Sequence, residues 1–185
     1  YFCVYPIKVN QQRQVVEEVL DFGRPYDFGL EAGSKPELLA VVAMATNETP
    51  IICNGFKDAE FIETAMMAHK MGRRIIPVVE KYTELGLILE YAQKVGVRPN
   101  IGMRVKLASR VGGAWNESSG DRSIFGLTTS QIVELIDSLR RHGRRRVHPP
   151  PTAPRHPDLG PGVGVRLAHD QVAADRVELT ALVAR

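Results

Sequence analysis

Short apolar runs alternate along the chain with longer stretches whose apolar residues recur at helical spacing. Runs rich in valine, isoleucine and aromatic residues are typical of buried strands. The stretches between them carry one apolar stripe, as an amphipathic helix does. The pattern predicts strands at 1–10, 26–30, 50–54, 74–79 and 100–105, and helices at 11–22, 35–45, 59–70, 83–95 and 129–139.

Local signals support several of these helix boundaries. Ser34 is a favourable N-cap, and Glu37 follows three residues later, which matches a capping box. Asp58 can cap the next helix, in which we expect Met66 and Met67 to face the core. A methionine pair at helical spacing indicates packing and not a cofactor site.

Five strand–helix units in succession indicate a parallel α/β array with right-handed crossovers. A doubly wound sheet and a (β/α)8 barrel both fit that pattern. The strands recur about 25 residues apart, and no G-x-G-x-x-G follows any of them, which favours the barrel. We therefore expect a partial (β/α)8 TIM barrel of about five βα units.

Lys8 stands near the end of the first apolar run. A lysine buried in a strand is costly unless it is paired or chemically used. One interpretation is an amine that reaches solvent at the mouth of the strand. The other is a lysine at the catalytic rim of a barrel that forms a Schiff base with an aldehyde cofactor.

Composition narrows the function classes. The 185 residues fit one domain, and 44% hydrophobic content allows a core. The net charge of +3 and the absence of aromatic–basic interleaving give no argument for nucleic-acid binding. No apolar run is long enough for a membrane span, and no signal peptide is visible. Two cysteines in strand-like runs indicate a reducing, cytoplasmic setting. Because the chain begins within a predicted strand and not at methionine, we expect a fragment.

The residues from 144 to 185 differ in character from those before them. They contain no lysine, isoleucine, phenylalanine or asparagine, and hold half of the 12 prolines. We expect a domain at 1–143 followed by an irregular Pro/Arg-rich tail at 144–185. Out-of-frame translation of GC-rich DNA explains the tail best, and a natural disordered tail is the alternative. Apolar spacing within 170–184 permits a helix there. The tail's histidines do not form a metal site, because prolines and glycines between them give no rigid geometry.

Several sequence blocks in order carry a resemblance to a known family. They are YPIKVNQQR at 5–13, GLEAGSKPEL at 29–38, IICNGFKD at 51–58, GMRVKLASR at 102–110 and GDRSIFGL at 120–127. Together they resemble the biosynthetic arginine decarboxylase family, which belongs to the barrel-type pyridoxal phosphate (PLP) enzymes related to alanine racemase. The resemblance covers residues 1 to about 143.

The resemblance implies roles for individual residues. Lys8 matches the lysine that holds PLP as a Schiff base. It could afterwards help to return a proton at the substrate Cα, for which burial would have to lower the pKa of its ammonium. Glu31 and Arg104 match residues that lie near the cofactor. For Glu31 the alternative is a strand-end carboxylate that caps the next helix through Ser34 and Lys35, and for Arg104 it is a surface ion pair.

Further implications concern the rest of the site and its partners. Asn10, Asn54 and Ser34 follow strand ends and are weaker candidates. The resemblance implies decarboxylation of L-arginine to agmatine and CO2 in polyamine and spermidine biosynthesis, with PLP and Mg2+, in a full-length protein that forms a homo-oligomer. No residues of this chain are assigned to a metal.

Two departures limit what the chain itself is expected to do. Relatives read S-K-F-G where this chain has Ile124 in place of the lysine, which puts one loop contact within 106–125 in doubt. The family's H-F-H-x-G-S histidine pattern, its glycine-rich phosphate cradle and its second domain are absent from the sequence. We therefore expect an inactive fragment. Another barrel-type decarboxylase, for ornithine or diaminopimelate, and a non-catalytic PLP-binding carrier protein are the alternatives.

Overall fold

The computed structural model describes residues 3–106, 126–145 and 179–183. Strands and helices alternate as the hydrophobic pattern predicts. The strands are β1 (Val4–Pro6), β2 (Gly29–Ala32), β3 (Pro50–Cys53), β4 (Arg74–Val79), β5 (Ile101–Val105) and β6 (Leu179–Val183). The helices are α1 (Arg13–Gly23), the 3-10 turn η1 (Arg24–Tyr26), α2 (Lys35–Met44), α3 (Ala59–Lys70), α4 (Tyr82–Val95) and α5 (Thr129–Arg145).

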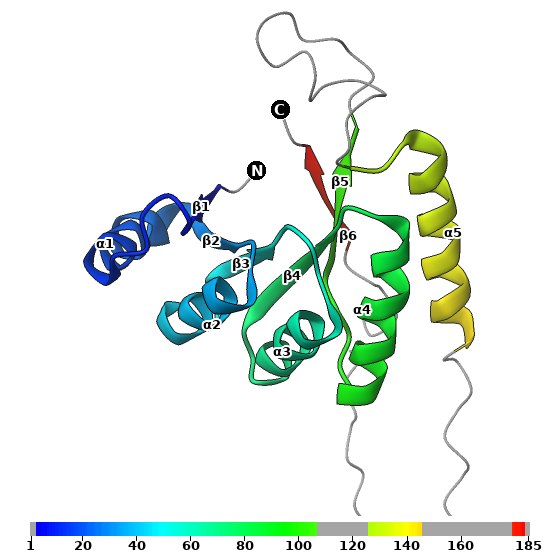
Figure 1. Cartoon of the computed structure of the whole chain (residues 1–185), viewed down its shortest axis with the longest axis horizontal. Coiled ribbons are helices and arrows are strands. Elements are labelled where there is room, and N and C mark those ends of the chain that lie inside the picture. The colour runs from blue at the N-terminus through cyan, green and yellow to red at the C-terminus, as the bar shows by residue number, and fades with distance from the viewer. Residues whose placement is uncertain (1–2, 107–125, 146–178, 184–185) are drawn as a thin grey trace, which may run out of the picture.

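Strand order decides between the two candidate architectures. The six strands pair in parallel and in sequence order, β1-β2-β3-β4-β5-β6. A doubly wound sheet reverses its strand order at a switch point, and no reversal occurs among the described strands. Right-handed crossovers in one constant direction place all helices on one side, and Figure 1 shows α1 to α5 fanned around the outside of the strands. The expected partial barrel is confirmed.

The sheet has two apolar faces, because successive strand residues point to opposite sides. In β4, Ile75 and Val79 belong to the main core beneath the helices. Ile76 and Val78 form a separate cluster with Ile52 of β3. We call the helix-covered side the outer face and the other side the inner face. The inner face is the one that a closed barrel surrounds.

The caps form largely as the sequence predicts. The Ser34 hydroxyl accepts from the Glu37 N–H, and the Asp58 carboxylate accepts from the Phe61 N–H at 2.8 Å. The Glu37 carboxylate accepts from the Gly33 N–H at 2.8 Å, one residue earlier than a standard capping box. Met66 is fully buried, but the prediction for Met67 is wrong, because its side chain is half exposed on the solvent side of α3.

The first strand is shorter than predicted, and this changes the environment of Lys8. Strand β1 ends at Pro6, and a turn follows in which the Val9 N–H donates to the Pro6 carbonyl at 3.1 Å. Lys8 lies in this turn and is exposed. The expectation of a lysine buried within a strand is therefore wrong: the chain leaves the sheet before Lys8, and the expected desolvation of its ammonium is not observed.

The described part of the tail also differs from expectation. Residues 179–183 form strand β6, which pairs with β5 from Ile101↔Leu179 to Val105↔Val183. The prediction that apolar spacing permits a helix within 170–184 is therefore wrong for residues 179–183. The tail is also not irregular throughout. Apolar residues without a helical cap can complete an open sheet edge instead, because β5 offers unpaired backbone groups there. The other predictions for the tail lie outside the described residues.

The two cysteines should differ sharply in reactivity. Burial raises the pKa of the Cys53 thiol to about 12, whereas Cys3 is exposed. Because the thiolate is the reactive form, a disulfide reagent at pH 8 should modify one thiol of the folded chain quickly and the second only on unfolding. Cys3→Ser should abolish the fast phase. Equal rates for both thiols in the folded chain would contradict this assignment.

Candidate functional site

Alternation along the strands brings polar side chains together on the inner face at the carboxyl edge of the sheet. Glu31 lies between Leu30 and Ala32, which both belong to the outer core. Asn54 and Glu80 each come two residues after members of the inner cluster. Arg104 follows the outer-face residue Met103 in β5. Parallel strands end at the same edge, so these residues share one layer, above the apolar inner cluster.

Lys8 and Glu31 are two of the residues that the sequence predicts for the site, and the fold brings them together. The Ile7 N–H donates to the Glu31 carbonyl at 3.2 Å, which fixes the turn that carries Lys8 against β2. The positive charge of Lys8 acts on the Glu31 carboxylate. Strand pairing therefore places the predicted cofactor lysine beside the predicted acidic residue.

Burial dominates the electrostatics of Glu31, which is 8% exposed. Burial raises the pKa of its carboxyl, whereas the Lys8 charge and a hydrogen bond from the Asn54 side chain act in the opposite direction. The nearby carboxylates of Glu37 and Glu80 raise the pKa further. Glu31 is thus an acid whose proton is held more tightly than usual, at the edge where Lys8 lies.

The alternative role of Glu31 as a helix cap does not fit the contacts. Ser34 and Glu37 cap the start of α2, as described above. Lys35 pairs with Asp58 at 2.9 Å and with Glu60 at 2.7 Å on the outer side. Ser34 therefore has a structural role, and the Glu31 carboxylate remains part of the inner-face layer.

Asn54 and Asn10, the weaker candidates, differ in environment. Asn54 is held by its N–H, which donates to the Ala32 carbonyl at 3.0 Å. Its Oδ1 is buried and has no hydrogen-bond partner in the described part of the chain. Asn10 is exposed, and its Oδ1 accepts from the Gln12 N–H at 3.0 Å, so it serves the turn before α1. Of the two, Asn54 belongs to the site.

Arg104 pairs with a carboxylate that sequence reasoning missed. Its guanidinium lies 3.2 Å from Glu80 Oε1. The exposed fractions are 31% for the Arg104 side chain and 8% for that of Glu80. The expected alternative, a surface ion pair, is therefore wrong in one respect, because the acidic partner is buried. The signal in the sequence is positional: Glu80 continues the inner-face alternation of β4 by one step beyond the strand.

A buried lysine and glutamate lie directly behind this pair, and sequence reasoning missed them as well. Lys57 has no exposed side-chain surface, and its ammonium lies 3.4 Å from Glu84 Oε2. Lys57 also donates to the Gly55 carbonyl at 2.7 Å. Glu84 Oε2 accepts from the Glu80 N–H at 2.8 Å, and Glu80 Oε1 accepts from the Gly55 N–H at 3.3 Å. The loops after β3 and β4 are thus connected through buried charges.

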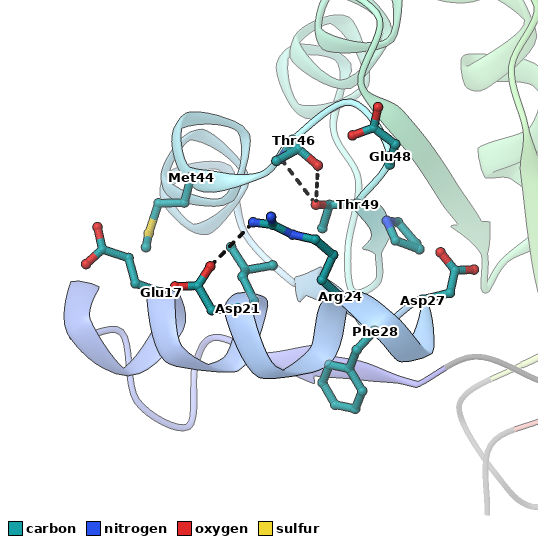
Figure 2. A pocket seen from close by; sticks show the side chains of 11 residues that line it. Glu17, Asp21, Arg24, Asp27, Phe28, Met44, Thr46, Glu48 and Thr49 are labelled. Atoms are coloured by element: carbon teal, nitrogen blue, oxygen red, sulfur yellow. Dashed lines mark hydrogen bonds and ion pairs between the residues drawn. The ribbon is translucent and has the colours of Figure 1, made fainter.

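A cavity of about 590 Å3 lies elsewhere in the molecule. Figure 2 shows it between α1 and the loop that leads into β3, at the amino ends of the strands. Two of its lining acids are paired, Asp21 with Arg24 and Asp27 with Arg74 at 2.8 Å. The cavity is at the opposite edge of the sheet from Lys8, so it is not part of the candidate site.

Two further features are missing from the described residues. No group of three or more His, Cys, Asp or Glu side chains could hold a metal ion in those ranges. None of the helices in the same ranges has the length and apolar character that crossing a bilayer requires. The predicted loop contact near Ile124 lies outside the described residues.

Comparison with known proteins gives a consistent result. Residues 1–144 match the pyridoxal-binding domain of pyridoxal-dependent decarboxylases. A biosynthetic arginine decarboxylase from Rhodopirellula baltica is 57% identical over 139 residues, which cover 75% of this chain and 21% of that protein. The chain spans about a fifth of the length of the curated relatives it matches.

Solved structures agree with the sequence relatives. The biosynthetic arginine decarboxylase from Campylobacter jejuni matches with a TM-score of 0.63 and 38% identity, covering 76% of this chain and 22% of that chain. Diaminopimelate decarboxylase from Helicobacter pylori matches with a TM-score of 0.62 and 19% identity, covering 76% of this chain and 34% of that chain. The second likeness shows a shared fold.

Removing the buried ammonium should destabilise the chain strongly. Lys57→Met leaves Glu84 as a buried charge without its partner, which costs about 3–5 kcal/mol of unfolding free energy. The matched control is Lys94→Met, which removes an exposed ammonium paired with Glu90 on α4 and should leave stability nearly unchanged. Urea unfolding followed by circular dichroism measures both. Equal losses in the two variants would show that the Lys57–Glu84 pair does not hold these loops.

Proposed function

Because the chain belongs to the pyridoxal-dependent decarboxylases, through their pyridoxal-binding domain, we propose that it carries the lysine-bearing part of an arginine decarboxylase site. The observation that carries this proposal is that Glu31, on which the Lys8 charge acts, and Arg104 share the inner-face layer at the carboxyl edge of the sheet. Barrel enzymes place their reactive groups at this edge. The names of the similar proteins favour arginine as the substrate.

The residues of this edge fit a pyridoxal phosphate group. Lys8 is exposed, so its amine is accessible to an aldehyde carbon. The buried Asn54 Oδ1 lacks a partner among the described residues, and a donor on a bound group would satisfy it. Arg104 adds a cation to the same layer. We infer that Lys8 would hold the cofactor covalently, with Glu31 and Arg104 as its neighbours.

The protein side of the chemistry is binding and proton control. When bound, the cofactor supplies a ring that accepts the electron pair left behind as CO2 departs. Glu31 would hold a proton near Lys8 Nζ, because burial raises the pKa of its carboxyl. Lys8 Nζ would then be the group that gains or returns protons beside the reacting carbon.

The wider assignment follows from the same family membership. Decarboxylation of L-arginine gives agmatine and CO2, and we propose that the product feeds polyamine and spermidine synthesis. A cytoplasmic setting, a homo-oligomeric full-length protein and the absence of nucleic-acid and membrane partners belong to this proposal. Mg2+ rests on the resemblance, without a supporting ligand group among the described residues.

We further propose that the 185 residues alone do not complete the reaction. The sequence does not contain the H-F-H-x-G-S pattern with which the family's ring-stacking histidine is associated. Residues 1–143 would form the cofactor domain, and 144–185 would be foreign to the family pattern, as an out-of-frame or disordered tail. The chain should therefore capture PLP without turning over arginine.

Covalent capture tests the role of Lys8. Incubation of the chain with PLP, reduction with borohydride and peptide mass spectrometry should show labelling concentrated on the peptide that contains Lys8. The reason is that Lys8 lies beside Glu31, whose buried carboxyl holds its proton more tightly than usual, whereas ion pairs with Glu60 and Asp58 raise the pKa of Lys35. Lys8→Arg should remove that label, and the control Lys35→Arg, at a lysine paired on the outer side, should retain it.

The same preparation should release no agmatine from arginine. Labelling spread evenly over surface lysines, with no loss in Lys8→Arg, would overturn the cofactor role. Agmatine release by the purified chain would overturn the proposed inactivity and leave the cofactor role intact.

A further inference from the structure

Glu80 contacts both Arg104 and the backbone of the neighbouring loop. Its Oε1 lies 3.2 Å from the Arg104 guanidinium and accepts from the Gly55 N–H at 3.3 Å. We propose that Glu80 is a positioning residue that holds the Arg104 guanidinium in the inner-face layer, where Arg104 contacts the phosphate-bearing cofactor. The contact of Arg104 with the cofactor rests on the proposed function, whereas the positioning of Arg104 by Glu80 does not.

The carboxylate of Glu80 is itself fixed from behind. The backbone N–H of Glu80 donates to Glu84 Oε2 at 2.8 Å, and Glu84 is paired with the fully buried Lys57. Lys57 in turn binds the carbonyl of Gly55, the residue whose N–H reaches Glu80. These contacts connect Glu80, Glu84, Lys57 and Gly55 in a closed ring, which restricts the movement of Glu80. An acceptor fixed in this way can orient a long arginine side chain. The charge-assisted hydrogen bond offsets the entropy that the side chain loses on ordering.

The position of the pair explains why it serves a ligand and not merely the fold. The Arg104 side chain is 31% exposed, so part of it is accessible to solvent although its partner is buried. The negative charge of Glu80 also reaches Glu31, which is beside Lys8. Surface ion pairs contribute little to stability, whereas a buried acceptor gives an arginine a defined direction.

The experiment combines a cofactor-independent measurement with a double-mutant cycle. The variants are Glu80→Gln, which keeps an oxygen for the Gly55 N–H but removes the charge, Arg104→Met, and the two together. Glu80→Ala is a second truncation. The matched control is Glu90→Gln, at an exposed carboxylate of α4 that pairs with Lys94. Thermal unfolding is recorded for every variant, so that loss of fold is separated from loss of position.

The first readout is the Arg104 Nη–H signal in 15N NMR without cofactor, because Nη1 is the atom that donates to Glu80 Oε1. The signal should exchange slowly with solvent in the unsubstituted chain and at least several-fold faster in Glu80→Gln and Glu80→Ala, with no change in Glu90→Gln. The second readout is the apparent affinity for PLP from borohydride capture at Lys8. Glu80→Gln should weaken it about tenfold, as expected for loss of a charge-assisted contact. The double variant should be no weaker than Arg104→Met alone.

The outcomes separate the two proposals. Additive losses in the double variant, or unchanged Nη–H exchange in Glu80→Gln, would overturn the positioning role. If the unsubstituted chain captures no PLP at Lys8, the proposed function fails, and the NMR measurement still decides whether Glu80 orders Arg104. Faster Nη–H exchange together with a non-additive loss of affinity supports the inference.

Discussion

The site depends on how the backbone of Gly55 is held at the end of β3. Its N–H is bound by a buried carboxylate and its carbonyl by a buried ammonium. The residue has a φ of +76°, and a Cβ added there would lie 2.8 Å from the Gly33 carbonyl oxygen. Only glycine combines that conformation with so close an approach. The ends of β2, β3 and β4 are therefore brought together at one point, and Glu80 and Asn54 take their positions from it.

The buried charges at this point are better explained by the defined loop geometry that they give than by a gain in the stability of the fold. Replacing buried ion pairs with apolar residues often leaves stability unchanged or higher. Here the pair Lys57–Glu84 binds backbone groups of two loops, which an apolar pair could not do. The same loops carry Asn54 and Glu80, which share the inner-face layer with Glu31 and Arg104. We infer that the charges are retained because they fix loop geometry where a ligand would bind.

Much of the fold could be predicted from sequence because it follows from local rules. Apolar periodicity located five of the strands, and short side chains such as Ser34 and Asp58 marked helix starts through their own hydrogen bonds. The length of β1 could not be predicted in this way, because the turn after Pro6 depends on backbone hydrogen bonds, one of them to the Glu31 carbonyl of the neighbouring strand. Strand β6 is far from β5 in sequence, so no local pattern indicates its partner.

The same distinction applies to the site. Lys8, Glu31 and Arg104 could be proposed because family motifs carry them. Lys57, Glu80 and Glu84 were missed because each looks like an ordinary charged residue at the start of a surface helix. Their roles arise only when the ends of neighbouring strands meet. Continuing the inside–outside alternation one step past β4 would have identified Glu80, but nothing comparable indicates the burial of Lys57.

The central claim is that strand pairing sets the Lys8 ammonium beside the Glu31 carboxylate. A carboxyl titration of Glu31 by 13C NMR tests it directly, in the unsubstituted chain and in Lys8→Met. The pKa of Glu31 should start above the ordinary glutamate range because of burial, and it should rise further in Lys8→Met because a charge that opposes the shift is removed. Lys35→Met, on the outer side, should leave it unchanged. A Glu31 titration that is the same with and without Lys8 would contradict the account.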